Sequence, residues 1–188
     1  TKLPLCVRID ADDCSGRRDL LADGWREIEM LNVFQHDGLP LRRRESPDNV
    51  ACRVVEPDEE FASRCAEIGA THRHGRLWRD YRVDRELARA TCAGWIGQSV
   101  RDLATVCIGG TWCGQLAGFL LVRDLRISFF AVAGEFRGRG IGRALLDHAM
   151  AITLPSLRAG TQGTNETATR LYLTSGFRVV EQWRTFHK

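Results

Sequence analysis

Short segments of the chain alternate between hydrophobic and polar residues, as β-strands do, while others repeat their apolar positions with the period of a helix. In the first part, strands are predicted over residues 5–9, 25–34 and 50–55. Helices are predicted over residues 19–23, ended by Gly24, and 57–68, begun by Pro57 and ended by Gly69. A turn is predicted over residues 37–40.

The second part opens with residues 71–82, which show no period and predict a loop. Asp84 is the expected N-cap of a helix. Three strands with short turns between them then indicate an antiparallel meander, over residues 103–108, 115–122 and 126–132. The remaining predicted elements are a helix over 140–152, a strand over 157–161, a helix over 166–174 capped by Asn165, and a strand over 177–186.

Two stretches of the chain resemble each other. Residues 21–29 (LADGWREIE) and 173–181 (LTSGFRVVE) both contain a helix end, a glycine, an aromatic residue and the start of a strand. Two interpretations are open. Helix–glycine–strand joints resemble each other in general, or the N-terminal part is a trimmed copy of the same half-fold.

The composition is that of a globular domain, with 44% hydrophobic and 27% charged residues among 188. No apolar run approaches the roughly 18 residues of a membrane helix, and no signal peptide is evident, so we expect a cytoplasmic protein without a membrane partner. Lys2 and Lys188 are the only lysines among 27 basic residues, and the net charge is only +3. No nucleic-acid partner is therefore expected. The arginine excess fits phosphate or carboxylate recognition, and equally a coding bias.

The cysteines are seven in number and have no C-x-x-C spacing. This pattern argues against a zinc site and against a disulfide framework, so no metal is expected. We expect the cysteines to be small, buried hydrophobic residues of the core. The alternative is that Cys107 or Cys113 is a nucleophile.

Residues 136–150, FRGRGIGRALLDHAM, join a loop rich in glycine and arginine to a helix. Gly142 lies inside that helix, where glycine costs about 1 kcal/mol relative to alanine, so another requirement must keep the backbone bare. Bare N–H groups at a helix N-terminus bind anions, most often phosphate. The loop has no lysine for a Walker motif, and its G-x-G-x-G spacing does not fit a dinucleotide-binding loop.

Residues 137–142 match R-x-x-G-x-G, the acyl-coenzyme A pyrophosphate loop of the GNAT superfamily of N-acyltransferases. Residues 165–177 match a second GNAT signature, N-x-x-A-x-x-L-Y-x-x-x-G-F, at every position. The resemblance covers about residues 100–188. It implies a mixed α+β fold whose central, mostly antiparallel sheet has one splayed parallel pair and flanking helices. We expect a truncated GNAT-like lobe over residues 1–70 and a catalytic domain over residues 71–188.

The resemblance implies an enzyme that transfers an acetyl group from acetyl-coenzyme A to a primary amine. Tyr172 takes the position of a tyrosine that faces the coenzyme A sulfur in many GNAT enzymes, and a phenol with a pKa near 10 suits a thiolate as proton donor. A core role for Tyr172, and a purely capping role for Asn165, are the alternatives. The implied coenzyme A contacts are Phe130, Ala131, Val132, Arg137, Gly138, Arg139, Gly140, Ile141, Gly142, Arg143, Asn165 and Ala168.

No general base is evident. Many GNAT enzymes carry a glutamate on the central strands, but residues 103–122 contain no carboxylate, and Asp102 lies only at their edge. Glu135 lies beside the loop, and a water relay is equally open. The histidines that remain candidates are His36, His72 and His74.

Residues 76–99 resemble the corresponding segment of dTDP-fucosamine acetyltransferase and its relatives, and the matching positions are Arg76, Leu77, Asp80, Arg82, Val83, Ala88, Trp95, Ile96 and Ser99. This resemblance implies a nucleotide-linked amino sugar as acceptor. It places Arg76, Trp78 and Tyr81 at the acceptor pocket, with Arg73, Arg79 and Arg82 also available to a diphosphate. The alternatives are a solvated basic loop, another small amine, a protein N-terminus, or a non-catalytic acyl-coenzyme A-binding module. Edge strands near the C-terminus allow a homodimer.

Overall fold

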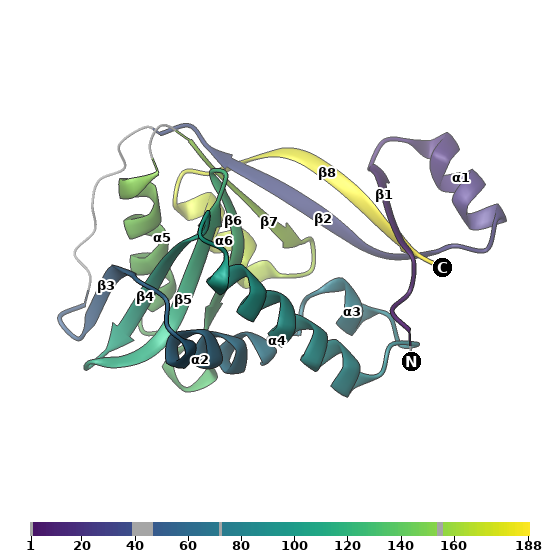
Figure 1. Cartoon of the computed structure of the whole chain (residues 1–188). Helices are drawn as coiled ribbons and strands as arrows, with labels where there is room; N and C mark the ends of the chain where they lie inside the picture. Colours follow the sequence, from purple (N-terminus) through teal and green to yellow (C-terminus); the bar gives the residue numbers. More distant parts are fainter. Residues whose placement is uncertain (1, 39–46, 72, 154–155) are drawn as a thin grey trace.

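The computed structural model describes residues 2–38, 47–71, 73–153 and 156–188. In this part of the chain eight strands form one sheet in the order β1-β8-β2-β7-β6-β5-β4-β3 (Figure 1). The strands are β1 (Cys6–Asp10), β2 (Arg26–His36), β3 (Val50–Val55), β4 (Val106–Trp112), β5 (Gln115–Arg123), β6 (Arg126–Val132), β7 (Leu157–Gln162) and β8 (Arg178–His187). The helices are α1 (Cys14–Ala22), α2 (Glu59–Ala70), α3 (Arg76–Arg79), α4 (Arg85–Arg101), α5 (Ile141–Ile152) and α6 (Glu166–Thr174). A short 3₁₀ turn, Gly134–Phe136, precedes α5.

Neighbouring strands are antiparallel except for β6 and β7, which run parallel. Their register covers only Arg126 with Arg158 and Ile127 with Ala159. Beyond Ile127 the two strands diverge, and the rest of β6 has a strand partner only on its β5 side. The predicted α+β fold, with one splayed parallel pair in a mostly antiparallel sheet, is confirmed.

Helices cover both faces of the sheet around β5. α2 and α4 pack together on one face, and α5 lies on the other (Figure 1). A Cβ at Gly69 of α2 would lie 3.6 Å from Phe119, whereas a Cβ at Gly118 would lie 3.2 Å from Leu145 of α5. Neighbouring residues of β5 thus contact opposite layers, which explains why this strand is apolar almost throughout instead of alternating.

The segment β1–α1–β2 repeats the arrangement of β7–α6–β8. α1 and α6 each have nine residues, and their N-caps Asp13 and Asn165 both accept a hydrogen bond from the N–H three residues further on. Gly24 and Gly176 follow the two helices with the same φ of +81°. β2 and β8 pair at the centre, with β7 beside β2 and β1 beside β8. The similarity of residues 21–29 and 173–181 therefore has a structural counterpart. The lobe boundary at residue 70 stays a prediction, and strands from both sides of it alternate in one sheet.

The predicted limits of the second helix are wrong. Asp58 and not Pro57 begins α2, because its carboxylate accepts the Phe61 N–H at 2.7 Å. The helix also continues through Gly69. A Cβ at Gly69 would lie 2.1 Å from the Ile96 side chain, so this glycine allows α4 to approach and does not end the helix.

Two further predictions need correction. β4 begins later than residue 103 and continues through Gly110, where a Cβ would meet Leu145 at 2.9 Å; this glycine brings α5 close to the sheet. Residues 71–82, predicted as a loop, contain α3. Part of the predicted turn at residues 37–40 lies outside the described residues. Among those that are described, no helix has the length and apolar character needed to cross a membrane.

Candidate active site

The loop between β6 and α5 has the backbone of an anion-binding site. Gly138 and Gly140 have φ of +77° and +84°, which residues with a Cβ disfavour. Gly140 is the N-cap of α5 and offers no side chain to the first N–H groups of the helix. These groups, at the positive end of the helix dipole, are left for an anion.

Packing does not require glycine at position 142. A Cβ there would lie 3.6 Å from Phe130 and 3.7 Å from Leu171 and Val132, which are ordinary contact distances. Gly142 is the second residue of α5, and glycine in a helix costs up to about 1 kcal/mol relative to alanine. Close approach of a ligand to the α5 backbone stays the predicted reason for this glycine.

The three arginines of the loop are held in different ways. Arg137 donates from Nε to the last carbonyl of β6 at 3.2 Å, which ties the loop to the strand. Arg139 lies over the Trp112 ring, 4.9 Å from its centroid. Arg143 donates to the last carbonyl of α6 at 2.9 Å and so joins α5 to α6. The predicted coenzyme A contact of Arg143 would have to coexist with this structural one.

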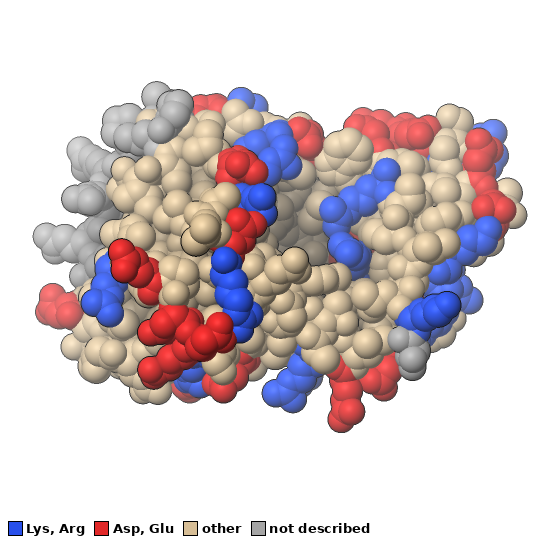
Figure 2. All heavy atoms as spheres, viewed as in Figure 1, with Lys and Arg blue, Asp and Glu red and all other residues tan. Residues whose placement is uncertain are grey.

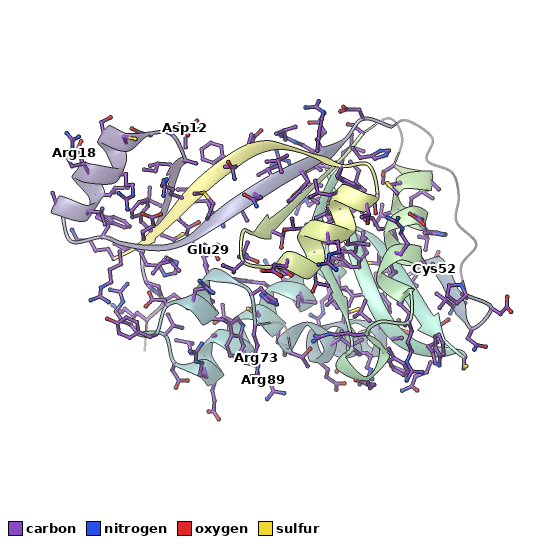
Figure 3. All side chains as sticks on the ribbon, turned by 180° about the vertical axis from the view of Figure 1, so that it is seen from behind. Asp12, Arg18, Glu29, Cys52, Arg73 and Arg89 are labelled. Carbon is purple, nitrogen blue, oxygen red and sulfur yellow. The ribbon has the colours of Figure 1, made fainter. Side chains whose placement is uncertain are left out.

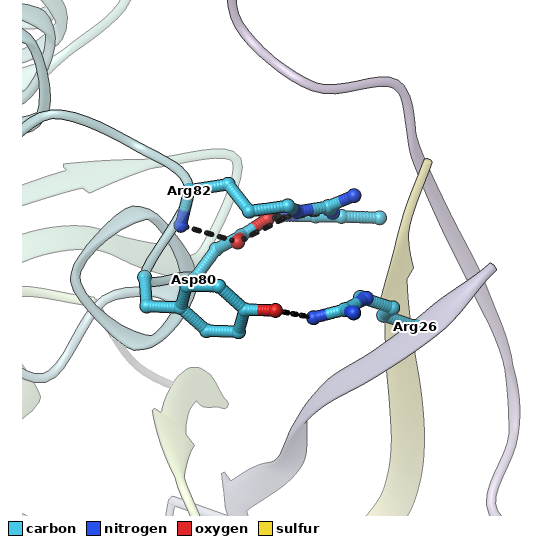
Figure 4. A network of polar contacts seen from close by, with 5 residues as sticks. Arg26, Asp80 and Arg82 are labelled. Atoms are coloured by element: carbon cyan, nitrogen blue, oxygen red, sulfur yellow. Dashed lines mark hydrogen bonds and ion pairs between the residues drawn. The ribbon is translucent and has the colours of Figure 1, made fainter.

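A cavity of about 330 Å³ lies where β6 and β7 diverge. Tyr81 is not among its lining residues, since this residue is 72% exposed and its hydroxyl accepts a hydrogen bond from the Arg26 guanidinium (Figure 4). Val132 also lies outside the lining, at the end of β6. The predicted site residues that line the cavity are Arg76, Trp78, Phe130, Ala131, Asn165, Ala168 and Tyr172.

Tyr172 and Asn165 enter the cavity from α6. Tyr172 is only 3% exposed, and its ring packs between Phe34 and Phe177 with centroids 5.3 and 5.4 Å away. Burial raises the pKa of the phenol, so it carries its proton at neutral pH. Asn165 caps α6 through the Ala168 N–H at 3.2 Å. Both residues therefore have a structural role and also face the cavity.

Sequence patterns did not single out Glu29, yet it lines the same cavity from β2 (Figure 3). It is 7% exposed, and no described residue offers either carboxylate oxygen a partner with hydrogen-bond geometry. Burial raises the pKa of Glu29 to about 7, although Arg8, Arg76 and the nearby Gln162 amide act in the opposite direction. A carboxyl group with this pKa exchanges its proton near neutral pH, as a general base must.

Topology explains why Glu29 was missed. The two GNAT signatures lie in the second half of the chain, so the resemblance directs the expected base to residues 103–122. However, β2 is inserted between β7 and β8, and an N-terminal strand thereby forms a wall of the cavity. The sequence signal that could have indicated Glu29 is the similarity of residues 21–29 and 173–181. Glu181, five residues after its glycine as Glu29 is after Gly24, pairs with Arg158, whereas Glu29 has no such partner.

The other candidates for a base do not line the cavity. Glu135 is exposed, Asp102 pairs with an arginine, and buried His36 accepts a backbone hydrogen bond. His74 is not a lining residue either. His72 lies outside the described residues.

The cysteines give no support for a nucleophile. Cys107 is buried, and burial raises the pKa of its thiol to about 11, so the reactive thiolate is scarce at neutral pH. Cys113 lies in an exposed turn. The expectation of buried cysteines holds only in part, because Cys6 and Cys14 are also exposed. The described residues contain no His, Cys, Asp and Glu group that could hold a metal ion.

The segment after α3 is anchored by a buried aspartate (Figure 4). Asp80 is 1% exposed, and its two oxygens accept hydrogen bonds from Arg82 Nε at 3.0 Å and Nη2 at 2.9 Å. His187 of β8 lies with Nδ1 3.0 Å from the same carboxylate. Arg82 lowers the pKa of Asp80, which stays ionised. Arg82 is thus occupied, and its suggested contact with a diphosphate is disfavoured.

We expect Asp80→Asn to destabilise the protein by about 2 kcal/mol, because it weakens buried, charge-assisted hydrogen bonds. It should also raise KM for the acceptor more than KM for acyl-coenzyme A, since α3 carries Arg76 and Trp78 into the cavity. Urea denaturation and steady-state kinetics measure the two effects. Asp124→Asn, in an exposed turn, is the control. Equal stability of both variants would contradict the anchoring role.

Comparison with known proteins finds a family match in the second half of the chain. The family model described as an acetyltransferase (GNAT) domain matches residues 101–179. Residues 101–179 are thus similar to a GNAT domain, and this match covers less than half of the chain. The prediction of an acyl-coenzyme A-dependent transferase is confirmed by this match and by the relative described next, while the dTDP-fucosamine group is not confirmed.

Individual relatives agree with this family. The chain is 29% identical to peptidyl-lysine N-acetyltransferase YjaB of Escherichia coli (strain K12) over 132 residues, which are 68% of this chain and 80% of YjaB. A GCN5-related N-acetyltransferase structure from Sphaerobacter thermophilus has a TM-score of 0.63 at 18% identity, covering 98% of this chain and 60% of the other. One from Kribbella flavida has a TM-score of 0.67 at 13% identity, covering 98% and 68%. The GNAT fold thus extends over the described chain, which spans about 60% of the first structure's length.

Proposed function

We propose that this protein transfers an acyl group, with acetyl as the expected one, from acyl-coenzyme A to the nitrogen of a primary amine. The observation that carries the proposal is one cavity lined by both Glu29 and Tyr172, beside the unpaired edge of β6. The loop at Gly138 and Gly140 would bind the pyrophosphate. The unpaired backbone groups of β6 would bind the pantetheine.

The two titratable residues suit the two proton transfers of the reaction. Glu29 takes a proton from the ammonium group, and the neutral nitrogen then forms a bond to the thioester carbonyl carbon. As the tetrahedral intermediate collapses, the carbon–sulfur bond breaks and Tyr172 gives its proton to the departing sulfur. The nitrogen of the intermediate releases its second proton to solvent as the amide forms, and the products are the amide and free coenzyme A. Glu29 then loses its proton to solvent and Tyr172 regains one.

The narrower form of the proposal takes the amino group of a nucleotide-linked amino sugar as the acceptor. It is supported by the resemblance of residues 76–99, of which Arg76 and Trp78 line the cavity. A lysine side chain of a protein is the second candidate, because the relative YjaB is named as a peptidyl-lysine acetyltransferase.

An acceptor panel tests the proposal. The protein is incubated with acetyl-coenzyme A and nucleotide amino sugars, small amines or lysine peptides, and release of free thiol is followed. Thiol release that depends on an amine, together with an acetylated product found by mass spectrometry, is the expected result. Tight acetyl-coenzyme A binding without any acetylated product would instead indicate a non-catalytic binding module.

Tyr172→Phe should lower kcat by about 10²-fold and leave the dissociation constant of acetyl-coenzyme A nearly unchanged. The phenyl ring keeps the packing against Phe34 and Phe177, while the proton donor is lost. Stopped-flow kinetics and calorimetry measure the two quantities. An unchanged kcat would remove Tyr172 from the mechanism, and a lower melting temperature would assign it a packing role.

A further inference from the structure

We propose that the acceptor amine carries a phosphate or carboxylate group, and that Arg8 and Arg76 bind this anion at the cavity. The inference rests on the proposed function, since it names the chemistry of the molecule that occupies the acceptor side. It assigns a binding role to Arg8, which no sequence motif indicates.

Arg8 has free donors at the cavity. It comes from β1, lines the cavity and is exposed. Its Nε donates to the Thr185 hydroxyl at 3.1 Å, which fixes the guanidinium and leaves both terminal nitrogens available. No salt bridge involves Arg8 in the described part of the chain.

Arg76 lines the cavity from α3. Its guanidinium lies over the Trp95 ring, 5.2 Å from the centroid, and forms no salt bridge with any described carboxylate. Stacking on an aromatic ring orients a guanidinium without using its donors, which suits planar recognition of an oxyanion. Two oriented arginines with unused donors are thus brought to one cavity by elements distant in sequence.

The charges at the cavity do not balance. Glu29 is the one acidic residue among those lining it, and it forms no ion pair with Arg8 or Arg76. The cavity is therefore positive when Glu29 is ionised, and more so when it is protonated. Figure 2 shows a recess with Lys and Arg side chains on both sides. This field favours an acceptor with an anionic group and disfavours polyamines or basic peptides.

The position of Arg8 and Glu29 in the fold also suggests a function for the N-terminal segment β1–α1–β2. Arg8 of β1 and Glu29 of β2 both belong to β1–α1–β2, which has no acyl-coenzyme A loop of its own. In the proposed arrangement the C-terminal half binds the acyl donor, while the repeat contributes a proton acceptor and an anion contact to the acceptor side.

Three small amines test the proposal. Propylamine has no charged group besides the amine, β-alanine also has a carboxylate, and O-phosphoethanolamine also has a phosphate. For at least one of the two anionic amines, kcat/KM should be about tenfold or more above the kcat/KM for propylamine. The anionic amine with the higher kcat/KM shows whether the site prefers a phosphate or a carboxylate. Arg8→Gln and Arg76→Gln should each lower that value about tenfold more than they lower kcat/KM for propylamine, which falls only through the change in the charge around Glu29, with KM for acetyl-coenzyme A unchanged. Arg89→Gln, on the outer side of α4 away from Glu29 (Figure 3), should have no effect.

Two outcomes would overturn the inference and leave the proposed function intact: equal turnover of all three amines, or equal losses for neutral and anionic amines in both variants. If no amine in either panel is acetylated, the proposed function fails. Calorimetry of O-phosphoethanolamine and β-alanine with the coenzyme A-saturated protein then decides the inference. Binding of either that weakens in Arg8→Gln supports it, and absence of binding by both contradicts it.

Discussion

Replacing Glu29 by Gln is expected to lower kcat/KM for the acceptor by about 10³-fold at pH 7.5, within the range lost with a general base. Glutamine keeps the shape of the side chain but cannot accept the proton. In the parent protein kcat/KM should rise with pH through about 7, the pKa of Glu29, and this limb should disappear in the variant. Stopped-flow measurement of thiol release from pH 5.5 to 9 provides both profiles.

The same substitution should stabilise the protein at alkaline pH. The pKa of Glu29 is about 7 in the folded state against 4.5 ordinarily, so the folded state binds more protons than the unfolded chain between these values. Stability therefore falls as pH rises from about 4.5 to 7, and the full cost, on the order of 3 kcal/mol, applies above pH 7. Urea denaturation should show Glu29→Gln to be more stable than the parent at pH 8, with little difference near pH 4.5.

Glu181→Gln is the matched control, because Glu181 occupies the equivalent position of the repeat. Its pKa is lowered, first by the hydrogen bond from Arg158, so its loss should reduce stability slightly and leave turnover unchanged. Gain of stability with loss of activity at Glu29 alone would mark a carboxylate retained for function. If Glu29→Gln kept full activity, the base would have to be sought in a water relay.

The acyl donor side could be predicted from the sequence because its chemistry is local. Glycines at 138 and 140 are required by the backbone of one loop, and Asn165 caps the helix that follows it in sequence, so these features repeat as short motifs. The divergence of β6 and β7 could be predicted as well, because the same motifs indicate the GNAT fold, which contains one splayed parallel pair.

The acceptor side could not be predicted in this way because it is assembled by topology. Glu29 and Arg8 reach the cavity only because β2 lies between β7 and β8, with β1 outside β8. No local pattern encodes that insertion. Arg82 shows the opposite case, because the resemblance made it available to a diphosphate although its side chain is held by Asp80. An arginine-rich segment does not reveal which guanidinium groups are already paired.

Gly140→Val is expected to abolish acetyl-coenzyme A binding. At φ of +84° a β-branched residue is strained by about 1–2 kcal/mol or more, and its Cβ would also meet Pro47 at 3.1 Å. Relief of this strain must move the backbone N–H groups at the start of α5, where the pyrophosphate is proposed to bind. Calorimetry gives the affinity, and circular dichroism reports whether the fold survives.

A second glycine separates ligand binding from folding even if Gly140→Val unfolds. Gly142 and Gly94 both lie inside helices and have room for a Cβ, so replacing either by Ala should raise stability by about 0.5–1 kcal/mol. Only Gly142→Ala should weaken acetyl-coenzyme A binding, because its Cβ would stand where the ligand approaches the backbone. Equal affinities for the two variants, despite equal gains in stability, would mean that Gly142 is not needed for the anion. Glycine would then be required for anion binding only at Gly138 and Gly140, the two residues before α5 with a left-handed backbone.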